Sequence, residues 1–276
     1  MKKLSRAPEN SYGMLQQTVA ASALDQVVES VRSIGYGILD SGYGADQLKR
    51  LSVEFDRVHR KYLDSYGEAR LKGLEEHNTI RAPLAQGSDE FLALAFNGNL
   101  LQALKKLIMG KFILNQQNGI INPPQQTYNQ GVWHRDLPYQ HFVSSTPLAI
   151  NALFCLDDFT FENGATFVLP ASHKLEAFPS SPYVQKNALQ IEAKAGSFIV
   201  LDCMLFHAGG FNATQTRRRA VNHIYNIPYF KQQINLPANM RDARLSTEQS
   251  EILGFRYVEP VSVAAYLSGR GPQKDN

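Results

Sequence analysis

The sequence predicts a mainly β protein, an antiparallel sandwich or barrel with helices packed against it. From residue 111 onward, short runs rich in β-branched and aromatic residues alternate with turn signals such as Pro123-Pro124 and Glu162-Asn163-Gly164. Many short strands separated by such turns are typical of antiparallel sandwiches and barrels. Before residue 111, apolar residues recur with a helical period instead. We therefore expect helices to flank a β core.

The amino-terminal part, from about residue 20 to 110, is predicted to be helical. Residues 22–33 place four apolar side chains on one helical stripe, and Gly35 is expected to end that helix. Further helices are expected over 46–65 and 98–109. The stripe of the first helix is Leu24, Val27, Val28 and Val31, and that of the second is Leu48, Leu51, Phe55, Val58 and Tyr62.

The β core is expected over about residues 111–230, followed by a carboxy-terminal extension over 231–276. The extension holds a capped helix start at Ser246. The chain of 276 residues is long enough for one large domain, so we expect a single domain over 1–276, with residues 1–20 as an extended arm. The predicted strands are 36–39, 111–121, 131–136, 149–156, 165–170, 197–202, 203–208 and 218–227.

Composition limits the possible partners and the compartment. The net charge is only +3, and the one tight basic cluster is Arg217-Arg218-Arg219, so nucleic-acid binding is not expected. Cys155 and Cys203 are isolated in apolar runs, which favours a reducing cytoplasm over a disulfide framework. No apolar run approaches the length of a membrane span, so no membrane association is expected.

One stretch, Val132-Trp133-His134-Arg135-Asp136, carries the residues best suited to chemistry. On a strand, His134 and Asp136 would share one face while Arg135 points away. One more histidine would complete the two-histidine, one-carboxylate triad of non-haem Fe(II) oxygenases. His207 is the candidate, because an antiparallel barrel makes neighbours of distant strands. The alternative is that His134 and His207 are ordinary surface or core histidines.

The arginine cluster offers a complementary group. A guanidinium holds a carboxylate through two parallel hydrogen bonds, as a dicarboxylic co-substrate bound to iron would require. On an alternating strand, Arg218 shares a face with Ala220 and Asn222, whereas Arg217 and Arg219 face the other way. Only one face can look into the barrel, and alternation alone leaves both choices open. The alternative is a solvated basic edge that discourages sheet pairing.

Four motifs in order make the chain resemble the phytanoyl-CoA dioxygenase family. They are Trp133 to Tyr139, Glu162 to Lys174, Ala195-Gly196-Ser197-Phe198, and His207 to Arg218. The resemblance implies a double-stranded β-helix, also called a jelly roll and similar to cupins. It implies Fe(2+), 2-oxoglutarate and O2 as cofactor and co-substrates. It further implies His134, Asp136 and His207 as metal ligands and Arg218 as the residue that holds 2-oxoglutarate.

The chain departs from the family pattern at two positions. Ala171 stands where the family usually has glycine in Pro-Gly-Ser-His, and Arg135 stands between the metal ligands where glutamine is frequent. We expect Arg135 to have a packing or gating role. Family members that halogenate lack the metal-binding carboxylate, so the presence of Asp136 favours hydroxylation.

Other polar residues are candidate contacts of the co-substrate. In similar enzymes a polar side chain on the strand before the metal segment bonds 2-oxoglutarate, and here that strand is rich in amides. Gln116 and Asn118 share a face and are the favoured pair, although bonds to neighbouring loops would explain them equally well. Thr166 is a further candidate and is equally at home as a plain strand residue.

The resulting hypothesis is an Fe(II)- and 2-oxoglutarate-dependent dioxygenase that hydroxylates an unactivated C–H bond of a small-molecule substrate, releasing succinate and CO2. One alternative is a non-catalytic jelly-roll protein that binds a metal or ligand. A second is a cupin-type metal hydrolase or isomerase, which would need the metal without 2-oxoglutarate. The sequence carries no signal for an oligomeric state.

Overall fold

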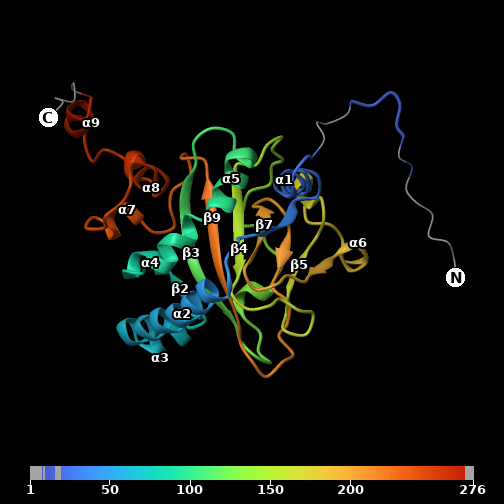
Figure 1. Ribbon diagram of the computed structural model, residues 1–276, viewed down its shortest axis with the longest axis horizontal. Helices are drawn as coiled ribbons and strands as arrows, with labels where there is room; N and C mark the ends of the chain where they lie inside the picture. Colours follow the sequence, from blue (N-terminus) through green and yellow to red (C-terminus); the bar gives the residue numbers. More distant parts are fainter. Residues whose placement is uncertain (1–7, 9, 16–19, 271–276) are drawn as a thin grey trace.

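The computed structural model describes residues 8, 10–15 and 20–270, and within these ranges the chain forms two β-sheets flanked by helices (Figure 1). The predicted mainly β fold with flanking helices is confirmed. Most of the expected arm at 1–20 lies outside the described residues. The larger sheet has the order β1-β7-β4-β9-β3-β2, and the smaller has the order β6-β5-β8. The strands are β1 (Tyr36–Asp40), β2 (Thr79–Arg81), β3 (Ile113–Asn122), β4 (Ala149–Cys155), β5 (Thr166–Val168), β6 (Leu189–Ile191), β7 (Ser197–Asp202), β8 (His207–Ala208) and β9 (Arg218–Asn226).

The two sheets enclose an apolar cluster between them. Val168 and Ile191 of the smaller sheet pack with Ile199, Leu201 and Ala220 of the larger one, and all five are buried. All pairs within both sheets are antiparallel. Distant strands therefore become neighbours, and this brings the sequence motifs together.

Helices cover the other face of the larger sheet, opposite the smaller sheet (Figure 1). Their packing buries Phe154 of β4, Val221 and Tyr225 of β9, and the apolar stripes of the helices in one large core. The helices are α1 (Ala23–Ile34), α2 (Ala45–Tyr66), α3 (Glu68–Gly73), α4 (Asp89–Ala95), α5 (Gly98–Leu107), α6 (Ser181–Asn187), α7 (Leu236–Asn239), α8 (Thr247–Ile252) and α9 (Val263–Ser268). Among the described residues, no helix is long and apolar enough to span a membrane.

The ends of α1 follow from its sequence. Ser22 accepts a hydrogen bond from the backbone N–H of Asp25, and the Asp25 side chain accepts one from the backbone of Ser22, which forms a capping box. Gly35 ends the helix with φ of 89°, a left-handed conformation that glycine adopts without strain. The predictions for this helix, and for those at 46–65 and 98–109, are confirmed to within two residues.

The strand predictions were right for the long strands and wrong for two short segments. Residues 131–136 are not a continuous strand, because only His134 forms a β-bridge, and a 3-10 turn covers Asn129–Gly131. Residues 203–206 form a turn, so β8 is limited to His207–Ala208. The three-residue strands β2 and β6 were not predicted.

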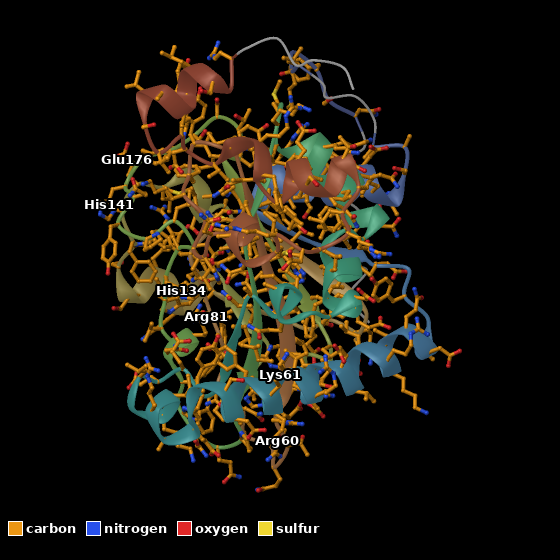
Figure 2. The ribbon with its side chains drawn as sticks, turned by 90° about the vertical axis from the view of Figure 1, so that its left-hand side faces the viewer. Arg60, Lys61, Arg81, His134, His141 and Glu176 are labelled. Carbon is orange, nitrogen blue, oxygen red and sulfur yellow. The ribbon has the colours of Figure 1, made fainter. Side chains whose placement is uncertain are left out.

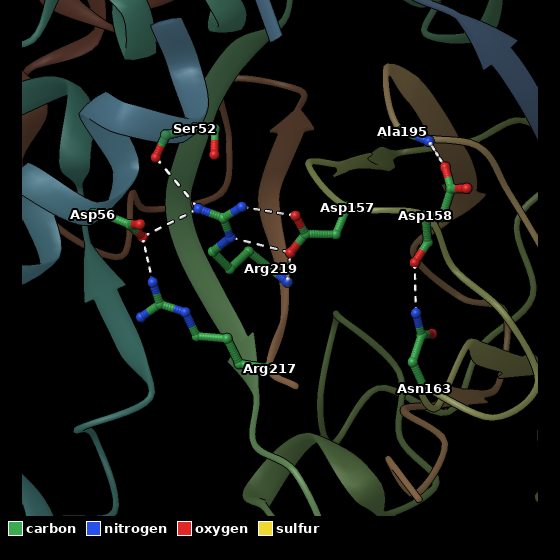
Figure 3. A network of polar contacts seen from close by, with 8 residues as sticks. All are labelled: Ser52, Asp56, Asp157, Asp158, Asn163, Ala195, Arg217 and Arg219. Carbon is green, nitrogen blue, oxygen red and sulfur yellow. Dashed lines mark hydrogen bonds and ion pairs between the residues drawn. The ribbon is translucent and has the colours of Figure 1, made fainter. Parts of the chain in front are cut away.

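The outward-facing arginines join α2 to the larger sheet (Figure 3). Arg217 donates to the Asp56 carboxylate at 2.8 Å. Arg219 donates to Asp157 at 2.8 and 3.1 Å and to Asp56 at 3.1 Å. These ion pairs fix which face of β9 points outward, and Arg218 therefore points between the sheets.

The carboxy-terminal extension packs onto the same core as the helices. The Gln232 side chain donates to the carbonyl oxygens of Leu114 in β3 and Leu253 after α8, at 2.8 and 2.9 Å. Ser246 caps α8 in a capping box with Gln249, as the sequence predicted. The extension therefore packs against the start of β3, near Leu114.

Candidate metal centre

The two candidate histidines are joined through their backbones. The N–H of His134 donates to the carbonyl of His207 at 3.0 Å, and the N–H of His207 donates to the carbonyl of His134 at 3.1 Å. This bridge places His134 beside β8 at the edge of the smaller sheet, and the two ring centroids are 4.3 Å apart. Although 131–136 is not a strand, His134 and Asp136 still lie on the same side of the chain.

The structure brings the three predicted ligands to one point. One ligand atom from each of His134, Asp136 and His207 lies within 4.8 Å of the others, and His207 Nε2 is 3.7 Å from Asp136 Oδ2. Two atoms bound at roughly 2.1 Å to one ion are at most about 4.2 Å apart, so one ion can bridge this pair. Figure 2 shows His134 on the side of the molecule that also carries His141 and Glu176.

Both imidazole rings are oriented by a carbonyl two residues earlier in the chain. His134 Nδ1 donates to the carbonyl of Val132 at 2.8 Å, and His207 Nδ1 donates to the carbonyl of Leu205 at 3.0 Å. Each bond fixes the tautomer whose Nε2 carries a lone pair. Burial, together with the charge that a protonated His207 would carry, lowers the pKa of His134 and keeps that ring in its neutral form, which can bind a metal.

Asp136 is held by two groups that the sequence reasoning did not single out. Asn151 Nδ2 donates to Asp136 Oδ2 at 2.8 Å, and the Asp136 N–H donates to the carbonyl of Cys203 at 3.1 Å. Asn151 lies on the inner face of β4, as its pairing with Ile224 and Leu201 requires. Such outer contacts orient a metal-binding carboxylate. The available signal was one amide in an otherwise apolar strand.

Arg218 is a buried cation without a carboxylate partner among the described residues. It is 3% exposed, its guanidinium carbon lies 3.8 Å from the centre of the Phe159 ring, and Nη2 donates to the Tyr128 hydroxyl at 3.4 Å. Its Nε has no partner. Burial lowers the pKa of Arg218, which reflects the desolvation of a charge that a bound carboxylate would offset.

One cavity is lined both by Arg218 and by two of the three candidate ligands, His134 and His207. Thr166 and Asn222 line the same cavity. A ligand in this cavity can therefore contact both the guanidinium of Arg218 and a metal held by the histidines. Tyr128 and Asn222 also line this cavity and were not predicted as contacts.

Gln116 and Asn118 face the same side of the larger sheet but do not line this cavity. Gln116 pairs with Ile224, and Asn118 pairs with Asn222 across β3 and β9. The Asn118 side chain bonds that of Gln233, in the carboxy-terminal extension, at 3.1 Å. Their role as co-substrate contacts remains a prediction.

The glycines after His207 allow close packing around the cavity. A Cβ atom on Gly209 would overlap the Tyr128 hydroxyl, and one on Gly210 would lie 2.6 Å from the carbonyl oxygen of Ala165. Space, and not an unusual φ, therefore requires glycine at both positions. Without this close approach, Tyr128 could not reach Arg218.

Arg135 points away from the candidate metal ligands, as predicted, and binds backbone carbonyls. Nε donates to Met204 at 2.7 Å, and the terminal nitrogens donate to Gln140 at 3.4 Å, Glu176 at 3.0 Å, Ser172 at 3.2 Å and also Leu175. The guanidinium carbon lies 3.9 Å from the centre of the Phe206 ring. The Arg135 side chain therefore has a packing role, because it joins three separate loops.

The sequence and the fold of this chain are similar to those of known proteins. An uncharacterised protein of Mycobacterium tuberculosis is 28% identical over 267 residues, covering 91% of this chain and 97% of its own. The iron/alpha-ketoglutarate-dependent dioxygenase ausO of Aspergillus calidoustus is 22% identical over 274 residues, covering 94% of this chain and 91% of its own. The crystal structure of the epimerase SnoN with Fe3+, alpha ketoglutarate and nogalamycin RO superposes with a TM-score of 0.59 at 17% identity, covering 81% of this chain and 92% of that one.

The structural likeness confirms the predicted jelly-roll fold. Residues 31–220 match the family described as phytanoyl-CoA dioxygenase (PhyH). Iron, 2-oxoglutarate and O2 are accordingly its cofactor and co-substrates. The chain belongs to the phytanoyl-CoA dioxygenase family and is an Fe(II)- and 2-oxoglutarate-dependent dioxygenase.

Proposed function

We propose that the protein hydroxylates an unactivated C–H bond of a small-molecule substrate, with release of succinate and CO2. The observation that carries this proposal is that His134, Asp136 and His207 lie close together, beside a cavity that is also lined by Arg218, a buried arginine whose Nε has no partner. The retained carboxylate supports hydroxylation over halogenation, because it occupies the position that a halide would need.

The residues present fit the groups that the family uses. His134, Asp136 and His207 would hold Fe(II) through two imidazole nitrogens and one carboxylate oxygen, which leaves the other coordination positions open. Arg218 would hold the distal carboxylate of 2-oxoglutarate, with donors from its terminal nitrogens and from Nε, which has no partner. When bound, iron with 2-oxoglutarate and O2 supplies the oxidising chemistry.

The protein itself contributes orientation and exclusion of water. The carbonyls of Val132 and Leu205 fix both imidazole rings, and Asn151 fixes the carboxylate. Arg218 is buried, so its charge acts in a medium of low dielectric constant, where its attraction for a carboxylate is stronger than in water. Thr166, which lines the same cavity, is a further candidate contact for the co-substrate.

Replacing one candidate ligand tests the proposal directly. We expect His134→Ala to abolish succinate formation from 2-oxoglutarate in the presence of Fe(II) and ascorbate, because two remaining ligands hold the metal too weakly. His141→Ala is the matched control, since this exposed histidine lies outside the cavity. Full succinate formation by His134→Ala would show that the metal is held elsewhere.

A further inference from the structure

Tyr128 places a phenol beside the guanidinium of Arg218. Its hydroxyl oxygen accepts a hydrogen bond from Arg218 Nη2 at 3.4 Å, and both side chains line the cavity that His134 and His207 also line. Within the described residues, this is the hydroxyl's one hydrogen bond, and the hydroxyl is the acceptor in it. A tyrosine hydroxyl can also donate, so its hydrogen is available to a ligand in the cavity.

The surrounding structure holds the hydroxyl and the guanidinium in place. The carbonyl of Gln130, two residues after Tyr128, accepts from the N–H of Gly209 at 2.7 Å. Gly209 leaves room for the phenol, because a Cβ atom there would overlap the hydroxyl. The guanidinium carbon of Arg218 lies 3.8 Å from the centre of the Phe159 ring. Both donors therefore have fixed positions before a ligand binds.

The phenol is in the protonation state that can donate to an anion. Burial raises the pKa of Tyr128, with a smaller opposing effect from the charge of Arg218, so the hydroxyl keeps its proton at neutral pH. A carboxylate has about four lone-pair positions, and a guanidinium that donates two parallel hydrogen bonds leaves some of them unfilled. Because an acceptor taken out of water without partners is unfavourable, a second donor beside the guanidinium favours a bound carboxylate.

We propose that Tyr128 is a specificity-determining residue for the co-substrate. Its hydroxyl donates to the distal carboxylate that Arg218 would hold, and thereby favours a dicarboxylate over a 2-oxo acid with an apolar tail. This inference rests on the proposed function, because it takes Arg218 as the co-substrate contact. Leu153, Leu201 and Ala220 also line the cavity, but their side chains carry no donor, so they cannot make this distinction.

The test uses Tyr128→Phe, which removes the hydroxyl and keeps the ring. Wild-type and variant protein, loaded with Fe(II) without oxygen, are titrated calorimetrically with 2-oxoglutarate and with 2-oxopentanoate. The second acid has the same number of carbons but a methyl group in place of the distal carboxylate. We expect the variant to bind 2-oxoglutarate about 10-fold more weakly, equal to roughly 1.4 kcal/mol, because a hydrogen bond to a charged group is lost. It should bind 2-oxopentanoate no more weakly than wild type.

Tyr229→Phe is the matched control, since this side chain is 93% exposed and does not line the cavity. Its affinities for both acids should equal those of wild type. The proposal is overturned if Tyr128→Phe binds 2-oxoglutarate as tightly as wild type, or if it loses affinity for both acids equally. The second result would identify Tyr128 as a structural part of the cavity wall, with no hydrogen bond to the distal carboxylate.

Arg218→Leu separates this inference from the proposed function. If Arg218→Leu loses the preference for 2-oxoglutarate over 2-oxopentanoate while Tyr128→Phe keeps it, the co-substrate site is supported and only the role of Tyr128 is contradicted. If wild-type protein shows no such preference, Arg218 holds no distal carboxylate, and the proposed co-substrate site fails together with this inference. A preference that falls in both variants supports both assignments.

Discussion

The burial of Arg218 bears directly on the free energy of the ligand-free protein. A fully desolvated guanidinium without a carboxylate is unfavourable in the ligand-free protein, and a bound dicarboxylate would repay this energy. Arg217, one residue earlier, is the natural comparison because its side chain is 44% exposed and already pairs with Asp56. The two neighbouring arginines should therefore respond to substitution in opposite ways.

We expect Arg218→Leu to weaken 2-oxoglutarate binding by about 100-fold, roughly 2.7 kcal/mol, because a charge-assisted pair is lost. The folded protein should lose no stability, since a buried unpaired charge is removed. Calorimetric titration of 2-oxoglutarate and thermal melting measure the two effects. Arg217→Leu should leave 2-oxoglutarate affinity unchanged, and an equal loss in both variants would contradict the assignment.

Strand alternation separated Arg218 from its neighbours but could not choose the inward face. That choice depends on Asp56 in α2 and Asp157 after β4, which pair with Arg217 and Arg219 from distant parts of the chain. Alternation likewise placed Gln116 and Asn118 on one shared face of their strand. It could not reveal that Asn118 bonds Gln233, because that contact depends on how the carboxy-terminal extension packs.

At the scale of elements, the Arg135 side chain supplies hydrogen bonds to a segment that forms no continuous strand. Residues 131–136 form no continuous strand, so few ladder bonds hold the segment that carries His134 and Asp136. The Arg135 side chain instead joins this segment to the turn before β8 and to the loop at 172–176. A planar guanidinium with five donors suits this task, whereas lysine offers a single charged nitrogen.

We expect Arg135→Gln to make residues 131–136 and the neighbouring loops more mobile. Several buried carbonyls lose their donor, which should lower the free energy of unfolding by about 2–3 kcal/mol. Faster amide hydrogen exchange over 137–147 and 172–176, and weaker Fe(II) binding, would follow. Unchanged exchange in these loops would show that Arg135 does not organise them. Arg256→Gln, at an exposed position, is the control.

The element predictions succeeded where local signals were strong. Ser22 and Gly35 fixed α1 through its caps, and the long strands β3 and β9 had enough periodicity to be recognised. The strand prediction for 131–136 failed, because a pair of hydrogen bonds to His207, far along the chain, organises this backbone. The juxtaposition of His134, Asp136 and His207 was nevertheless predicted, since it rested on motif order and not on regular structure, and their binding of a metal stays a prediction.

For the whole molecule, a buried neutral histidine links stability to pH. His223 is fully buried against the helices, where Nδ1 donates to the carbonyl of Ala152 at 3.1 Å and Nε2 accepts from Gln117 at 2.9 Å. Burial lowers the pKa of His223 to about 4, from 6.5. Between these two values, the unfolded chain binds a proton at this residue and the folded protein does not. Stability therefore falls as the pH drops through this window.

Denaturant unfolding at pH 7.5 and pH 5.5 measures this contribution. The proton that the unfolded chain binds at His223 should by itself lower the free energy of unfolding by roughly 1.4 kcal/mol at the lower pH. His223→Gln should be less stable than wild type at pH 7.5 and lose less on acidification. Asp202, whose pKa is raised by burial, opposes the trend and is common to both proteins. An identical pH dependence of the two proteins would contradict this origin.

The burial of both cysteines has a consequence for a catalyst that handles oxygen. Cys155 and Cys203 have no exposed surface, and burial raises the pKa of both thiols well above the usual range. Only the thiolate is readily attacked by peroxide and related oxidants. Although the Cys203 backbone touches Asp136, its sulfur is therefore shielded from stray reactive species formed in unproductive cycles. Burial should therefore make both thiols resistant to oxidation.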